Sequence, residues 1–136
     1  MIARRFSGVI AAFAVTAALL AGCSSSSSTP AVCTDVASLK TSVTGLKDVN
    51  VKEQGVSAVT DELNKIKQQL TTLKNDAKGQ YSTQIDDMSN ALDGLTSSLN
   101  AAKDNANAAT LGAVASATGA VVTAGNNLVT AVSHTC

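Results

Sequence analysis

The sequence predicts an all-α protein, an up-down four-helix bundle with a short first helix, and three observations support this. Apolar residues recur every three or four positions from residue 36 to residue 132, and only a helix places residues so spaced on one face. No segment alternates apolar and polar residues for long enough to indicate a strand. Cysteines stand at both ends of the periodic region, at Cys33 and Cys136, and an even number of antiparallel helices returns such ends to one end of a bundle. We expect a signal over residues 1–22, a tether over 23–32 and the bundle over 33–136.

The first 22 residues have the order of a secretory signal. Arg4 and Arg5 precede an apolar stretch over residues 6–20, which is followed by small residues. The stretch is shorter than the ~20 residues that a membrane-spanning helix needs. The segment Leu20-Ala21-Gly22-Cys23 resembles the bacterial lipobox. This resemblance implies that Cys23 is acylated, becomes the first residue of the exported chain and holds it on the extracytoplasmic face of the cell membrane. An ordinary signal peptide with a chance cysteine, or a single membrane anchor, is the alternative.

The exported part has a composition that excludes several partners. Residues 24–28 are all serine and are followed by Thr29 and Pro30, which is typical of a solvated tether. After residue 22 the chain carries 8 lysines against 10 acidic residues and has Tyr81 as its sole aromatic residue. Without a basic patch, we expect neither nucleic acid nor anionic lipid as a partner. Without aromatic platforms, we do not expect the chain to stack on sugars or bases.

With Cys23 assigned to the lipid, two cysteines remain. An exported chain reaches an oxidising compartment, so we expect Cys33 and Cys136 to form an intramolecular disulfide. Two free thiols, or a bridge between two molecules, are the alternatives. His134 stands close to Cys136, but the sequence has no second histidine and no paired-cysteine spacing. We therefore expect no metal site and no cofactor.

The first helix is expected to begin at a cap on Thr34 or Asp35 and to end near Asp48. Threonine and aspartate side chains can accept hydrogen bonds from the free amides of a first helical turn. Residues 49–55 are expected to be extended and to make up the missing length along the bundle. The second helix should follow Gly55, with Ser57 as a possible cap, and end near residue 77. The apolar residues of these helices are Val36, Leu39, Val43, Leu46, Val56, Val59, Leu63, Ile66, Leu70, Leu73 and Ala77.

A break at Lys78-Gly79 is expected to separate the second helix from a third, because glycine readily adopts the left-handed conformation that ends a helix. The third helix should start at Tyr81 or Ser82 and end at Asp104. One unbroken helix over residues 56–104 is the alternative, but three long helices would place the paired cysteines at opposite ends. The apolar residues of the third helix are Tyr81, Ile85, Met88, Leu92, Leu95, Leu99, Ala102 and Ala106.

The fourth helix is expected over residues 108–133, after a turn at 105–107. Its apolar face comprises Leu111, Val114, Thr118, Val121, Gly125, Leu128 and Val132. Residues 111–132 carry no charge and are long enough to span a membrane. Asn126 and Asn127 interrupt this stretch, and polar groups in lipid need partners, so we favour a buried bundle helix.

The sequence contains no catalytic constellation. Asp86, Asp87 and Asp93 form the densest acidic group, yet all three lie off the apolar face of the third helix. Motifs of hydrolases and phosphate-binding loops are absent. We therefore expect a non-catalytic binding or spacer module in the cell envelope. The alternatives are a bundle that holds a small apolar ligand and a coiled coil that self-assembles, with an envelope protein or a second copy as partner.

Several residues of the exported part also resemble a family of small exported actinobacterial proteins of unknown function. The matching features are Cys33, the element Leu46-Lys47-Asp48-Val49-Asn50-Val51, Gly55 with Ala58, and the terminal Cys136. The resemblance implies a helical envelope protein of an actinobacterium and supplies no activity.

Overall fold

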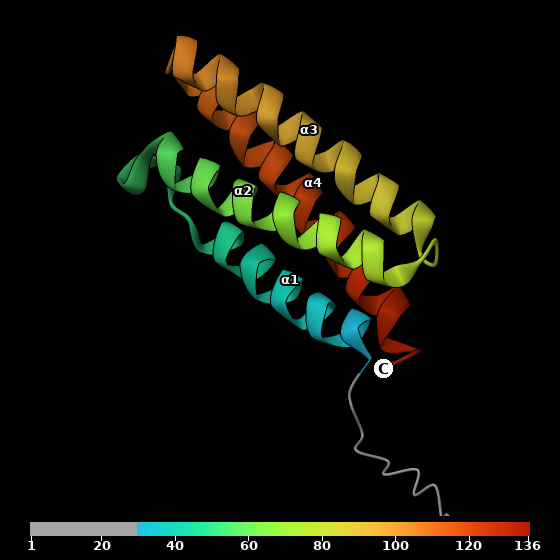
Figure 1. Ribbon diagram of the computed structural model, residues 1–136. Coiled ribbons are helices and arrows are strands. Elements are labelled where there is room, and N and C mark those ends of the chain that lie inside the picture. Colours follow the sequence, from blue (N-terminus) through green and yellow to red (C-terminus); the bar gives the residue numbers. More distant parts are fainter. Residues whose placement is uncertain (1–29) are drawn as a thin grey trace, which may run out of the picture.

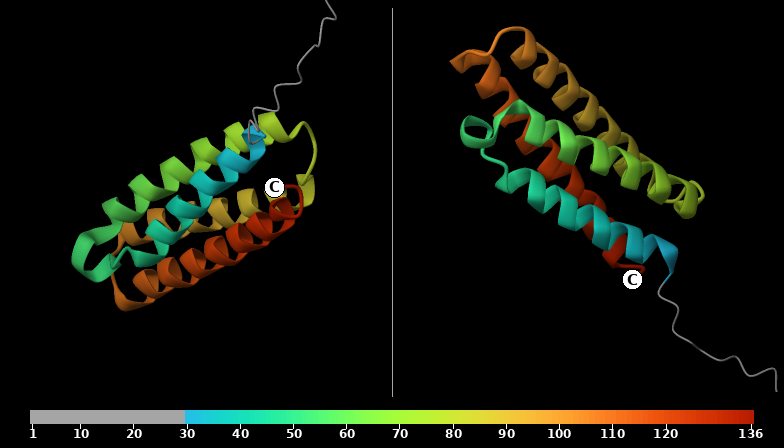
Figure 2. Two further views of the ribbon diagram at one scale, coloured as in Figure 1. Left: turned by 90° about the horizontal axis from the view of Figure 1, so that it is seen from below. Right: turned by 60° about the vertical axis from the view of Figure 1, so that its left-hand side comes forward.

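The computed structural model describes residues 30–136, which form four helices and no strand. Residues 1–29, which hold the predicted signal, Cys23 and most of the tether, lie outside the described part. The helices are α1 (Ala31–Asp48), α2 (Val51–Ala77), α3 (Ser82–Asp104) and α4 (Ala108–Ser133). Figures 1 and 2 show successive helices running in opposite directions; α1 and α3 each pack against both α2 and α4. The predicted up-down four-helix bundle is confirmed.

The predicted apolar faces form the core. Nearly every apolar residue named for the four helices is buried, and the largest of them are fully enclosed. The exceptions lie near helix ends or on the rim: Val56, Tyr81, Leu111 and Thr118 are partly buried, and Ala106 is exposed. The spacing of three and four residues therefore determines which face of each helix points inward.

The chain breaks between α2 and α3, so the single long helix is excluded. Lys78 has φ 48° and Gly79 has φ 89°, and both angles lie in the left-handed region. Tyr81 has φ 59° and directly precedes α3. The chain thus reverses at Gly79, as predicted, but Lys78 and Tyr81 also adopt the left-handed conformation, which is less favourable for residues other than glycine.

The predicted start of the first helix is wrong. Helix α1 begins at Ala31 instead of at a cap on Thr34 or Asp35, because the Pro30 carbonyl already accepts from the Cys33 amide at 2.8 Å. The first helix thus starts two residues before Cys33.

The predicted extended segment over residues 49–55 is limited to Val49 and Asn50. The Asn50 side chain accepts from the amide of Lys52 at 3.1 Å and starts a new helical turn. Gly55, with φ 78° and ψ 174°, is not helical and kinks α2, so the helical segment that continues to Ala77 begins after Gly55, as predicted. Residues 49–55 therefore form a corner and do not make up the missing length of α1.

Helix α4 is part of the bundle. Val114, Val121 and Leu128 are fully enclosed between α4 and its neighbours. A β-carbon placed on Gly125 would lie 3.0 Å from the Val43 Cγ2 atom, so α4 approaches α1 closely there. The helix is buried on one face only, and its length and apolar composition would also allow it to cross a membrane.

The two ends of the bundle differ. At one end, which we call the disulfide end, Cys33 and Cys136 lie at disulfide distance, with their Cα atoms 5.8 Å apart. The Tyr81 and Thr135 hydroxyls are hydrogen-bonded at the same end. The other end, which we call the distal end, holds the α1–α2 corner and the α3–α4 turn (Figure 1).

Candidate functional site

A groove at the distal end results from the unequal lengths of the helices. Helix α1 has 18 residues and α4 has 26, a difference of about 12 Å at 1.5 Å per residue. Because their paired ends meet at the disulfide end, the whole shortfall appears at the distal end. In Figure 1, α1 stops well before the first turns of α4. The α1-facing side of those turns is therefore left without a covering helix.

The groove has a volume of about 920 Å³. This value lies within the range of ligand-binding pockets, ≈ 300–1,000 Å³. One wall is the α1–α2 corner and the other is the first half of α4. The residues that line the groove are Lys47, Asp48, Val49, Asn50, Val51, Lys52, Ala108, Leu111, Gly112, Ala115, Thr118, Gly119 and Val122.

Both walls of the groove are fixed by local hydrogen bonds. On the α4 side, the Asn107 side chain accepts from the amides of Ala109 and Thr110, and the Thr110 hydroxyl accepts from the Asn107 amide. This reciprocal cap satisfies free amides of the first turn. On the other side, Asn50 caps α2 and Gly55 redirects it. The groove is thus built from anchored segments.

The floor and the rim of the groove differ in polarity. The α4 wall carries no charge, and Leu111 and Val122 on it are partly buried against the core. All charged lining residues lie on the corner: Lys47 and Lys52, with Asp48 between them. Two lysines against one carboxylate leave the rim with a net positive charge. An apolar floor beside a cationic rim matches an amphiphilic, anionic molecule.

A pair of carboxyl groups lies between α1 and α2 near the disulfide end. Burial raises the pKa of Asp35 above its ordinary value of 3.8, and the nearby Asp76 carboxyl raises it further by hydrogen bonding and charge repulsion. The buried Asp35 Oδ2 atom has no hydrogen-bond partner among the described residues. The pair makes this contact pH-sensitive, but no further ligand group is gathered around it.

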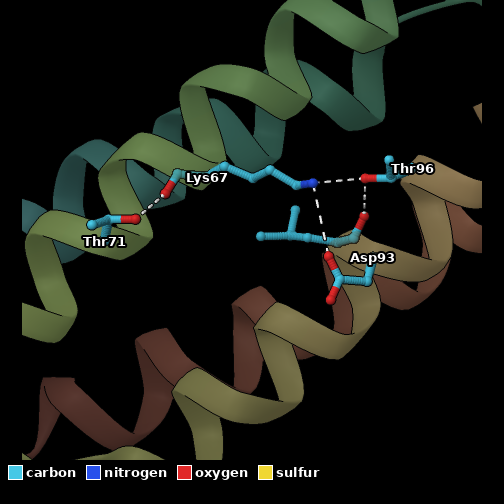
Figure 3. A network of polar contacts seen from close by, with 5 residues as sticks. Lys67, Thr71, Asp93 and Thr96 are labelled. Carbon is cyan, nitrogen blue, oxygen red and sulfur yellow. Dashed lines mark hydrogen bonds and ion pairs between the residues drawn. The ribbon is translucent and has the colours of Figure 1, made fainter.

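A polar contact joins α2 to α3 on the outer surface. The Lys67 Nζ atom donates to the Thr96 hydroxyl at 2.8 Å and lies 3.8 Å from Asp93 Oδ1 (Figure 3). The Asp93 side chain is 78% exposed, and an ion pair in such a position contributes at most about 1 kcal/mol. We assign this contact a minor structural role.

The structure brings together some of the residues singled out in the sequence. Cys33 and Cys136 meet, whereas Cys23 lies outside the described residues. Asp86, Asp87 and Asp93 are exposed on α3. Within residues 30–136, no three acidic, cysteine or histidine side chains are grouped so that they could hold a metal ion.

Sequence reasoning missed the groove. The short first helix could have indicated the groove, because a neighbouring helix of 26 residues must extend beyond it. Residues 49–55 were expected to cover the part of α4 that extends beyond α1, so the sequence analysis predicted no groove there. No protein-family model, curated protein or solved structure matches the chain.

Proposed function

We propose that this protein is a cell-envelope lipoprotein, acylated at Cys23 on the extracytoplasmic face of a membrane, whose helical domain is a non-catalytic binding module. The lipobox-like Leu20-Ala21-Gly22-Cys23 supports the anchor. The Cys33 and Cys136 pair supports an oxidising compartment, where disulfides persist. Lipobox processing attaches at least two acyl chains, and two chains suffice for stable membrane binding.

The position of the groove at the distal end supports the proposed binding role. The chain enters the bundle at Ala31, at the disulfide end, whereas the groove lies at the distal end. Helix α4 separates the two ends by about 39 Å at 1.5 Å per residue. An anchor at Cys23 would therefore hold the groove away from the membrane surface, where soluble molecules and other envelope components can reach it.

The anchor is tested by mass spectrometry and fractionation of the full chain expressed in a bacterial host that processes lipoproteins. We expect the membrane fraction to contain a protein that lacks residues 1–22 and carries acyl groups on Cys23. Cys23→Ala should abolish acylation and membrane retention, while the neighbouring Ser24→Ala, as a matched control, should change neither. Recovery of unacylated wild-type protein in the soluble fraction would refute the anchor.

The binding role is tested by native mass spectrometry of the purified protein. Gly119 lines the groove, and no atom lies within 4 Å of a β-carbon built on it. Gly119→Leu should therefore fill the groove without a clash and remove a co-purifying small molecule. Gly94 on α3 is equally open and lies outside the groove, so Gly94→Leu should retain that molecule. The same occupancy in both variants would contradict a binding role for the groove.

A further inference from the structure

The groove also indicates the chemistry of its ligand, an inference that rests on the proposed binding role. The floor runs along α4 from Ala108 to Val122, a length of about 21 Å at 1.5 Å per residue. Over this length α4 presents only uncharged residues, and Gly112, Ala115 and Gly119 place at most a methyl group on the floor. A long, narrow apolar molecule fits such a floor better than a compact one.

The charged residues of the rim favour a ligand with a negative charge. Lys47 belongs to the last turn of α1 and Lys52 to the first turn of α2. The corner at Val49 and Asn50 brings both lysines to the same wall. Lysine is a flexible donor with three N–H bonds and suits a single anionic head group.

Helix polarity does not set the charge preference of the groove. Both α2 and α4 begin at the distal end, but α1 and α3 end there, so positive and negative ends of helix dipoles oppose one another. The preference for an anion therefore rests on the rim, whose three charged residues leave one net positive charge.

We propose that the groove binds a free long-chain fatty acid, with the hydrocarbon chain along α4 and the carboxylate held by Lys47 and Lys52. The apolar floor removes the hydrocarbon chain from water, and the favourable free energy of this burial grows with each buried CH₂ group. The lysines select a carboxylate over an uncharged head group. Their contribution should weaken as salt increases, because exposed charges are screened.

Palmitate binding to residues 23–136 with Cys23→Ser tests this proposal, since this chain keeps all four helices and both paired cysteines. Isothermal titration calorimetry should show saturable binding of one palmitate. Gly119→Leu should abolish binding, whereas Gly94→Leu should leave it unchanged. Equal affinity in these two variants, or no saturable binding to the parent chain, would overturn the proposal.

Charge variants test the head group. The double variant Lys47→Gln/Lys52→Gln should weaken palmitate binding at least tenfold, whereas Lys40→Gln, on an exposed part of α1 outside the groove, should not. Asp48→Asn should strengthen binding. Hexadecanol, which lacks the charge, should bind the parent chain and the double variant with equal affinity. An unchanged palmitate affinity in the double variant would refute the role of the lysines.

Two other occupants are distinguished in the same preparation. Binding of phosphatidylglycerol vesicles without binding of palmitate would overturn the proposal in favour of a lipid surface. A concentration-dependent dimer in sedimentation that Gly119→Leu dissociates would overturn it in favour of a second copy. If a different molecule leaves the groove in Gly119→Leu, the fatty-acid proposal fails while the proposed binding role stands. Acylation of Cys23 is measured separately and is affected by none of these results.

Discussion

The close approach of α1 and α4 predicts that replacing one glycine by alanine destabilises the protein. A β-carbon on Gly125 would lie 3.0 and 3.1 Å from the two methyl carbons of Val43 and 3.6 Å from Met88 Cε. Valine has one strongly preferred side-chain rotamer in a helix, so its methyl groups cannot rotate away. Relief would require α1 or α4 to move, although each is packed against two neighbouring helices.

The expected change in the free energy of unfolding follows from two opposing effects of Gly125→Ala. Replacing a helix-interior glycine by alanine stabilises the helix by ~1 kcal/mol. Adding a methyl group to a tightly packed contact costs typically 1–3 kcal/mol. We expect the overpacking to prevail and the free energy of unfolding to fall by about 1 kcal/mol.

Gly94→Ala is the matched control. Gly94 is also inside a helix, and no atom lies within 4 Å of a β-carbon placed on it. It should gain the helix propensity alone, about 1 kcal/mol. Urea denaturation followed by circular dichroism in the far ultraviolet would measure both variants. In a Val43→Ala background, Gly125→Ala should become less destabilising, because the opposing methyl groups are gone. If Gly125→Ala stabilises the protein as much as Gly94→Ala, the packing argument is wrong.

Three further predictions concern the disulfide end and can be checked by urea denaturation. The raised pKa of Asp35 in the folded state means that its contribution to stability is fully present below the ordinary pKa of 3.8 and is lost as the pH rises through the folded-state pKa. Asp35→Asn should therefore be more stable than the wild type at pH 7 and equal to it at low pH; a constant difference, or the same result for the exposed Asp86→Asn, would contradict this. Lys78 is a non-glycine residue with φ 48°, so Lys78→Gly should stabilise the protein by about 0.5–1 kcal/mol. A loss of stability would show that contacts of the Lys78 side chain stabilise the protein by more than its left-handed backbone costs. Reduction of the disulfide, which joins residues separated by 103 positions, should lower the free energy of unfolding by about 2–5 kcal/mol, and an unchanged midpoint would mean that no bond forms.

Helix existence and the inward faces could be predicted because both depend on local spacing. Residues such as Leu63, Ile66 and Leu70 are three or four positions apart, which fixes a common face in any helix. The start of α4 was also predictable, because Asn107 is a strong capping residue before an uninterrupted helical segment. The start of α1 was not, because Pro30 and the competing caps Thr34 and Asp35 all suit a helix N-terminus.

The sequence by itself therefore determined the four helices, their apolar faces and the cysteine pairing that requires an even number of helices. Only the tertiary structure decided how far each helix extends beside its neighbour. The contact of Val43 with Gly125 sets how closely α1 approaches α4, and the kink at Gly55 changes the course of α2 beyond its first turn. The groove and the Asp35–Asp76 contact depend on this alignment, which arises from packing between segments that are distant in the chain and leaves no periodic signal in the sequence.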